Sequence, residues 1–218
     1  MTIPATALHF EVVPPRTGAA PHPCLVMLHG LGADEQDLLS LAGLLDPRLL
    51  VVSIRAPFSY GPGYAWYNLR QIDDLDLGTF HHSLDLLQRF MANVPHQFPV
   101  DAQHIYGLGF SQGAMMTGSL RLLEPTSSTG SILLSGYLPL SQSLAFKASE
   151  LPGAPFFIAH GSYDDVVALE YGRQARDYLE WAGAAVAYHE YSMSHQIIGP
   201  EIRELNSWLQ TQLKLHGT

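Results

Sequence analysis

Residues suited to nucleophilic catalysis occur along this chain in the order serine, aspartate, histidine. Ser111 is the central residue of a G-x-S-x-G motif at 109–113, the adjacent pair Asp164 and Asp165 follows, and His195 comes last. In acyl transfer a histidine removes the proton of a serine hydroxyl, and a carboxylate orients the imidazole ring. A lone G-x-S-x-G also occurs by chance, so the prediction of such a catalytic set depends on the three residue types appearing together in this order.

Acyl chemistry also needs backbone N–H groups that stabilise a developing oxyanion. One donor is expected from Gln112, which directly follows the serine. The other is expected from the glycine-containing loop HGLGAD at 29–34, where glycines permit close approach of the backbone. Asp34 in this loop is also a candidate helix cap, and that role is compatible with the first.

The elements that must position these residues alternate between short apolar strands and amphipathic helices. This alternation predicts a single α/β domain over residues 1–218, with a mostly parallel twisted sheet flanked by helices. Ser111, the aspartate pair and His195 each come directly after a predicted strand, where open parallel sheets bind ligands. Strands are expected near residue 8 and at 24–29, 49–54, 104–109, 131–135, 155–160 and 185–191. Helices are expected at 78–92, 112–123, 167–182 and 198–213.

Two segments that connect predicted strands and helices could cover the candidate catalytic residues. Residues 55–77 contain glycines, prolines and aromatic residues without clear periodicity, which is typical of a shaped functional loop. The segment between Gly136 and Pro155 is short, so no large lid domain is expected there.

Composition argues against several other functions. The chain has 218 residues and a net charge of -9, with only 11 Lys and Arg, which disfavours nucleic-acid binding. Its only cysteine, Cys24, lies in an apolar run and cannot form an internal disulfide, and the histidines lack the paired spacings of zinc sites. We expect no metal, no cofactor, no secretion signal and no membrane span, and hence a cytoplasmic protein.

Motifs along most of the chain resemble those of the α/β-hydrolase carboxylesterases, a family that includes lysophospholipases and acyl-protein thioesterases. The matching stretches are HGLGAD (29–34), RAP (55–57), AWYNL (65–69), GFSQGA (109–114), HGSYDDVV (160–167) and MSH (193–195). The resemblance implies Ser111 as nucleophile, Asp164 as orienting acid and His195 as base, with Leu31 and Gln112 forming the oxyanion hole. Asp165 is then expected to cap the following helix. The chain departs from the family's usual pattern at Ala168, Glu35 and Asn68, so substrate preference is not carried over.

The expected activity is hydrolysis of short- to medium-chain carboxylic esters through an acyl-enzyme. Without a lid, loop residues must form the acyl pocket. The candidates are Leu31, Phe58, Tyr64, Trp66, Met115 and Ile197, although Met115 and Ile197 suit the core equally well. A thioesterase or lysophospholipase would use the same triad, and a catalytically silent binding protein would lack one of its members. The expected partner is a small ester substrate, and homo-oligomerisation stays open.

Overall fold

The computed structural model describes residues 8–71, 74–142 and 144–215. Its centre is a seven-stranded sheet with the strand order β1-β3-β2-β8-β9-β10-β11. Only β1 is antiparallel to its neighbour, and the other five pairings are parallel. The strands are β1 (Phe10–Val13), β2 (His22–Leu28), β3 (Leu50–Ile54), β8 (Val100–Phe110), β9 (Gly130–Leu134), β10 (Pro155–Gly161) and β11 (Ala185–Tyr191). The predicted mostly parallel sheet is confirmed.

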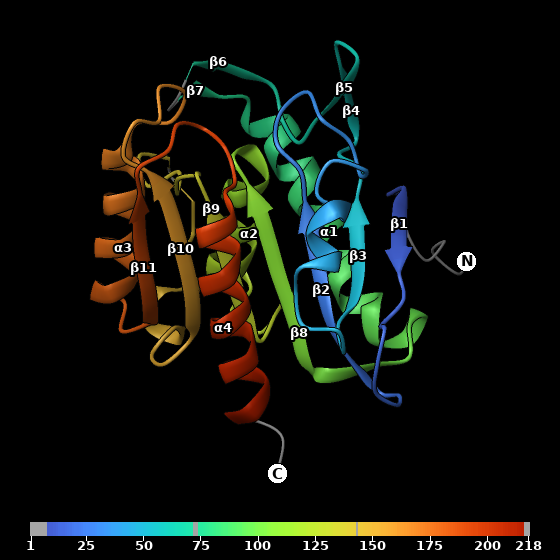
Figure 1. Ribbon diagram of the computed structural model, residues 1–218. Helices are drawn as coiled ribbons and strands as arrows, with labels where there is room; N and C mark the ends of the chain where they lie inside the picture. The colour runs from blue at the N-terminus through green and yellow to red at the C-terminus, as the bar shows by residue number, and fades with distance from the viewer. Residues whose placement is uncertain (1–7, 72–73, 143, 216–218) are drawn as a thin grey trace.

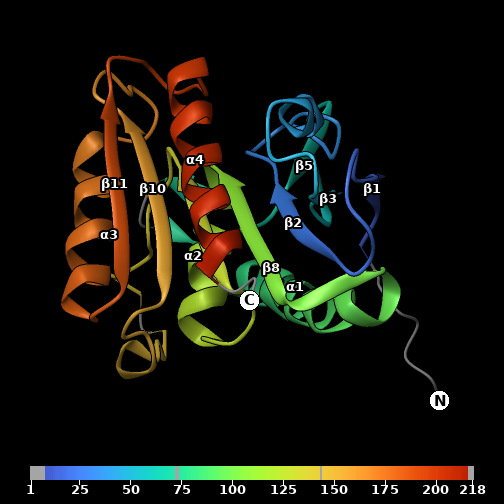
Figure 2. The same ribbon diagram turned by 60° about the horizontal axis from the view of Figure 1, so that its bottom comes forward.

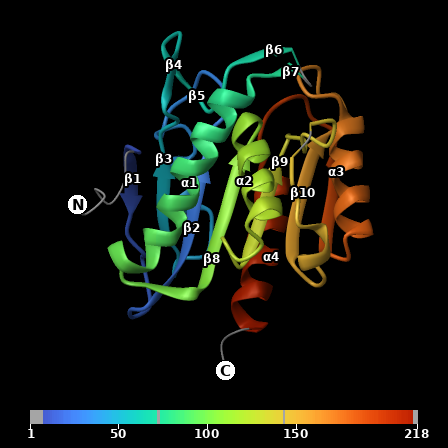
Figure 3. The same ribbon diagram turned by 180° about the vertical axis from the view of Figure 1, so that it is seen from behind.

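Helices cover both faces of this sheet. They are α1 (Leu77–Gln97), α2 (Gln112–Leu123), α3 (Leu169–Trp181) and α4 (Gly199–Leu215), with short 3₁₀ helices η1 (Leu39–Gly43) and η2 (Ala148–Glu150). Helices α1, α2 and α3 lie on one face, and α4 lies on the other (Figures 1 and 3). Each predicted helix is present, and α1 continues five residues beyond its expected end at residue 92.

The alternation of side chains along each strand explains these layers. In β2, Val26 and Leu28 pack with the cluster under α1 and α2, whereas Leu25 and Met27 pack with the cluster under η1 and α4. All four are almost completely buried. Successive side chains of a strand point to opposite faces, so a run that is apolar at every position fits a sheet covered on both sides.

Residues 55–77 contain more regular structure than the sequence predicts. Two small antiparallel sheets form there, one from β4 (Phe58–Tyr60) and β5 (Gly63–Ala65), the other from β6 (Leu69–Gln71) and β7 (Asp74–Leu75). Both lie at the end of the molecule to which the arrows of β2, β3, β8, β10 and β11 point (Figure 1). This segment therefore covers the carboxyl edge of the sheet, where the loops carrying the candidate residues also lie.

Candidate active site

Ser111 occupies a sharp corner between β8 and α2. Its φ of 54° and ψ of -117° are unusual for a residue with a side chain. A Cβ at Gly109 would lie 2.2 Å from the carbonyl carbon of Gly113, and one at Gly113 would lie 2.1 Å from the Leu28 carbonyl oxygen. Both glycines are therefore required by the close approach of strand, turn and helix, and the turn presents the serine above the sheet edge.

The three residues proposed for catalysis are brought together in one hydrogen-bonded chain. His195 Nε2 lies 2.8 Å from Ser111 Oγ, and His195 Nδ1 lies 2.8 Å from Asp164 Oδ2. Ser111 follows β8, Asp164 follows β10 and His195 follows β11, so three loops at the same sheet edge supply them. The arrangement can pass a proton from the hydroxyl to the imidazole while the carboxylate fixes the ring tautomer.

The choice between the adjacent aspartates is clear from their contacts. Asp164 has a fully buried side chain, and its Oδ1 accepts the amides of Val166 and Val167 at 3.0 and 2.8 Å. The amide bonds hold the carboxylate so that its other oxygen faces His195. Asp165 instead accepts the hydroxyl of Ser194 at 3.1 Å. The expectation that Asp165 caps the next helix is wrong, because α3 begins after Ala168, which makes no side-chain cap.

His160 lies directly behind the carboxylate of Asp164. Its Nε2 is 2.8 Å from the Val167 carbonyl oxygen and 3.5 Å from Asp164 Oδ2. The side chain is completely buried, and burial lowers its pKa, so the neutral ring donates Nε2–H to Val167. A Cβ at Gly172 of α3 would lie 2.6 Å from its Nδ1, so this glycine leaves room for the ring. His160 is not among the predicted site residues, although it begins the HGSYDD stretch.

The two expected oxyanion donors border the same cavity as the serine. Leu31, Ser111, Gln112 and His195 all line a hollow of about 390 Å³. Gln112 is the first residue of α2, where backbone N–H groups have no partner within the helix. A Cβ at Gly30 would lie only 3.4 Å from the Cβ of Ser111, so the loop that carries Leu31 packs against the corner.

Hydrogen bonds from the 55–77 segment fix this corner and the loop beside it. The Gln112 side chain accepts the Trp66 amide at 2.7 Å and donates to the Tyr67 carbonyl oxygen at 2.9 Å. The Trp66 indole donates to the His29 carbonyl oxygen at 2.9 Å, and the Gly32 amide donates to the Tyr64 carbonyl oxygen at 2.8 Å. Both expected sources of oxyanion donors are thus tied to one covering segment.

None of the three aromatic residues expected to bind substrate, Phe58, Tyr64 and Trp66, lines the cavity. Trp66 and Met115 are completely buried in the core, and Trp66 uses its indole as a structural donor. Phe58 packs beside His82 with ring centroids 5.6 Å apart, and Tyr64 lies under the Arg55 guanidinium at 4.6 Å. Leu31 does line the cavity. Ile197 lines a neighbouring groove instead.

Other residues form the cavity wall, and sequence reasoning missed them. They are Tyr67, Leu69, Phe110, Tyr137, Val166 and Val167, together with Gly30, Ala33 and Asp37. Several follow strand ends, which is the one pattern that could have identified them. Burial raises the pKa of Tyr67 well above its usual value, and its hydroxyl donates to the sulfur of Met115.

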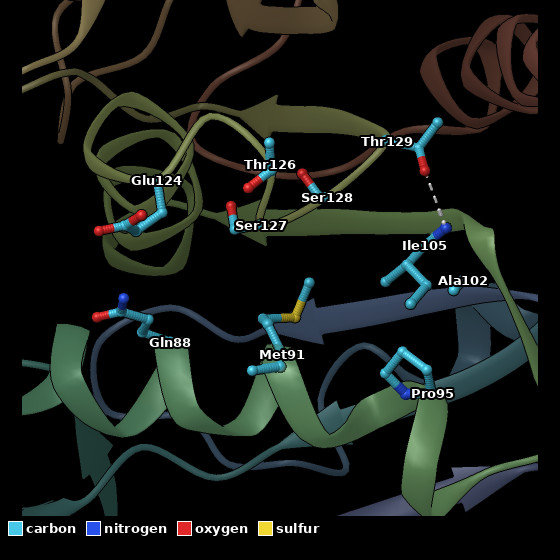
Figure 4. Close-up of a pocket in the computed structure, with 11 residues that line it drawn as sticks. Gln88, Met91, Pro95, Ala102, Ile105, Glu124, Thr126, Ser127, Ser128 and Thr129 are labelled. Atoms are coloured by element: carbon cyan, nitrogen blue, oxygen red, sulfur yellow. Dashed lines mark hydrogen bonds between the residues drawn. The ribbon is translucent and has the colours of Figure 1, made fainter.

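A further cavity lies away from this site, between α1, the start of β8 and residues 124–129 (Figure 4). It holds about 310 Å³ and is bordered by Gln88, Met91, Glu124 and hydroxyl residues such as Ser127. Ala102 and Ile105 of its wall belong to the amino-terminal half of β8, far along the strand from Ser111. Among the described residues that line it there is no histidine, cysteine, lysine or arginine.

One group of potential metal ligands occurs among the described residues. Ligand atoms of His9, Glu11 and Glu35 lie within 4.8 Å of one another. However, Arg55 donates to both carboxylate oxygens of Glu35, at 2.5 and 2.6 Å, and this guanidinium lowers the pKa of Glu35. The ion pair already compensates the buried carboxylate and places a positive charge where a cation would bind.

The residues 8–213 match the family model described as phospholipase/carboxylesterase. The chain belongs to this family. It is 28% identical to acyl-protein thioesterase 1 of Mycosarcoma maydis, over 91% of this chain and 95% of that one. A crystal structure of esterase PE8 is 27% identical with a TM-score of 0.82, covering 94% of this chain and 98% of that one.

The carboxylesterase of Mesorhizobium loti, at 21% identity, has a TM-score of 0.84 over 95% of this chain and 97% of its own. This structural similarity confirms the α/β-hydrolase fold, and family membership makes the chain a hydrolase. In the described ranges 8–71, 74–142 and 144–215, no helix combines the length and apolarity needed to cross a bilayer.

Proposed function

We propose that this chain is a serine carboxylesterase that hydrolyses short- to medium-chain carboxylic esters through an acyl-enzyme. The observation that carries the proposal is the unbroken chain of 2.8 Å contacts from Ser111 through His195 to Asp164, at the border of an apolar cavity. Membership in a family of phospholipases and carboxylesterases supports the same chemistry.

In the proposed reaction His195 takes the Ser111 proton as the hydroxyl oxygen attacks the ester carbonyl carbon. The amides of Leu31 and Gln112 stabilise the resulting oxyanion, and each such donor is typically worth ~100- to 1,000-fold in turnover. His195 then gives its proton to the departing alcohol oxygen. Water repeats these steps on the acyl-enzyme, which releases the acid and restores the serine.

The size of the cavity supports the acyl-chain preference. Its volume of about 390 Å³ is near the lower end of small-molecule sites, which hold roughly 300 to 1,000 Å³. Val166 and Leu31 at its border are both exposed, so the hollow opens to solvent beside the serine. A short, open and apolar hollow suits short and medium acyl chains better than long ones. Efficient hydrolysis of long-chain triglycerides would contradict this part of the proposal.

The test is hydrolysis of p-nitrophenyl esters from acetate to palmitate by wild type, Ser111→Ala and Ser194→Ala. Ser194 is an exposed serine next to His195 whose hydroxyl contacts Asp165, so it is a matched control. Turnover should peak at short or medium chains, fall by up to ~10⁶-fold in Ser111→Ala and stay near wild type in Ser194→Ala. Equal rates in wild type and Ser111→Ala would refute the role of the serine.

Thioester hydrolysis is the second candidate, because a relative named acyl-protein thioesterase 1 aligns with 91% of the chain. A lysophospholipase would use the same residues, and only the leaving group distinguishes these activities. Adding an acyl thioester and a lysophospholipid to the panel separates them by kcat/KM. If the chain is instead a catalytically silent binding protein, a fluorophosphonate probe should not label Ser111. A cytoplasmic location and a single domain over residues 1–218 stay predictions of the sequence.

A further inference from the structure

The cavity at Ser111 adjoins a second hollow beyond His195, which we call the distal groove. It holds about 350 Å³, and half of its lining residues are aliphatic, whereas Asp37, Ser40 and Gln196 contribute polar groups. The aliphatic residues are Leu38, Leu41, Leu44, Ile197, Ile198 and Ile202. The groove lies between η1 and the start of α4, two elements on the same face of the sheet (Figure 2). Asp37, Phe110 and His195 line both hollows, so the two hollows adjoin each other at the base.

The direction of proton transfer distinguishes the two hollows. His195 Nε2 must deliver its proton to the departing oxygen, so the leaving group has to extend on the side of the imidazole. The cavity at Ser111 contains the nucleophile together with Leu31 and Gln112, which surround the carbonyl end of the substrate. The distal groove contains His195 but neither Ser111 nor the oxyanion residues. The acyl chain therefore fits the first hollow and the alcohol fits the second.

The lining of the distal groove defines which alcohols it suits. Its six aliphatic side chains include Leu44, whose surface is 62% exposed. Because Leu44 both lines the groove and is exposed, the apolar part of the lining reaches solvent, where a ligand can enter. Asp37 is the only charged residue in the lining apart from the titratable His195. The Arg203 guanidinium approaches the rim, 3.3 Å from a Cβ position at Gly199, but does not line the groove.

We infer that the distal groove binds the leaving group and selects esters of uncharged, hydrophobic alcohols. This inference rests on the proposed esterase function and makes it narrower. An anionic leaving group, such as a phosphate-bearing alcohol, would bring its charge next to Asp37 with no lysine or arginine in the lining to compensate it. The enzyme should therefore prefer substrates that are apolar on both sides of the ester bond.

The test varies the alcohol while the acyl group stays constant. Release of butyrate from methyl butyrate, hexyl butyrate and the butyrate ester of 6-hydroxyhexyl phosphate is followed by titration at constant pH. The quantity compared is kcat/KM, because it covers the steps up to departure of the alcohol. Wild type should prefer the hexyl ester over the methyl ester by at least ~10-fold, since apolar contacts give about 10- to 200-fold discrimination. The phosphate-bearing ester should have a lower kcat/KM than hexyl butyrate.

Leu44→Glu places a charge in the distal groove at a position that is already exposed to solvent. It should lower kcat/KM for hexyl butyrate and thereby abolish the preference for hexyl over methyl butyrate, whereas Leu77→Glu should keep that preference. Leu77→Glu is the matched control, because Leu77 is an exposed leucine that lines neither hollow. A glutamate is also compatible with its place at the start of α1.

The remaining outcomes separate failure of the inference from failure of the proposed function. If no ester is hydrolysed in a Ser111-dependent way, the esterase proposal itself fails. If methyl butyrate is hydrolysed but Leu44→Glu keeps the hexyl preference, the groove does not bind the alcohol. If Leu44→Glu instead changes which acyl chain is preferred in a series of methyl esters, the assignment of the two hollows is reversed. Preference for the phosphate-bearing ester that disappears in Arg203→Gln would overturn the charge selection.

Discussion

Replacing Gly63 by alanine should inactivate the enzyme without changing any residue of the catalytic set. Gly63 begins β5 and is buried against the loop that carries Leu31. A Cβ there would lie 2.1 Å from the Gly32 carbonyl oxygen and 2.6 Å from that of Ala33. Unstrained non-bonded contacts to carbon need about 3.3 to 3.6 Å. The loop must therefore move by about 1 Å, because both contacts are to backbone atoms that cannot rotate away.

The movement should reach the oxyanion hole because the hairpin and the loop are bonded to each other. Gly32 donates to the Tyr64 carbonyl oxygen at 2.8 Å, and Tyr64 donates to Ala33 at 2.9 Å. A misplacement of about 1 Å costs roughly 100-fold in rate. Complete loss of the Leu31 donor would cost up to ~1,000-fold, or about 4 kcal/mol of transition-state stabilisation. We therefore expect kcat for p-nitrophenyl butyrate to fall by about 100- to 1,000-fold.

The assay pairs kcat with thermal unfolding, so that loss of activity is not confused with loss of the fold. Gly61→Ala is the matched control in the same hairpin, since nothing lies within 4 Å of its Cβ position. Its φ of +57° should make alanine cost about 1 to 2 kcal/mol of stability. Its kcat should nevertheless stay near wild type. A folded Gly63→Ala enzyme with wild-type kcat would refute the proposed link between this hairpin and the oxyanion hole.

Three further substitutions or modifications test the site and its surroundings. Asp164→Asn should lower kcat by ~10⁴-fold, whereas Asp165→Asn should stay within a few-fold of wild type; equal losses would refute the assignment of the orienting acid. Burial raises the pKa of Glu201 from 4.5 to about 7, which favours the protonated carboxyl in the folded state. The stability that this group contributes is therefore complete below pH ~4.5 and is lost as the pH rises through about 7. Glu201→Gln should therefore gain about 3 kcal/mol relative to wild type between pH 4.5 and 8.5 in urea unfolding, and a constant difference would contradict this. Burial also raises the pKa of Cys24 to about 12, so iodoacetamide at pH 8 should label it only after unfolding.

The order of strands and helices could be predicted from the sequence because periodicity depends on local burial. Val26 and Leu28 face one layer while Leu25 and Met27 face the other, and such runs are visible in the sequence. The end of α1 was harder to predict. It continues through Pro95 to Gln97, since the tertiary packing of Phe90, Met91 and Val94 supports a last turn that local propensity disfavours.

The candidate catalytic residues on loops that follow strands could be predicted from the sequence, but the residues of the cavity wall could not. Ser111 and His195 follow strands, and their residue types restrict their roles. Trp66, by contrast, lies in the segment expected to form the pocket yet turns into the core, where its indole bonds the His29 carbonyl oxygen. Val166 lines the cavity although nothing in its own type indicates this. Which side of an irregular loop faces a ligand depends on long-range contacts, and these have no sequence period.

The way the 55–77 segment is fastened has a consequence for how this enzyme can diversify. Three of the fastening points are main-chain groups, namely the Trp66 amide, the Tyr67 carbonyl oxygen and the Tyr64 backbone, and a fourth is the Trp66 indole. Leu69, in contrast, meets the cavity through its side chain. Under the proposed function, a residue that borders the substrate and the groups that hold the catalytic corner thus lie in one segment but use different atoms. Substitution of Leu69 should then change which esters fit while the contacts that hold the catalytic corner stay in place.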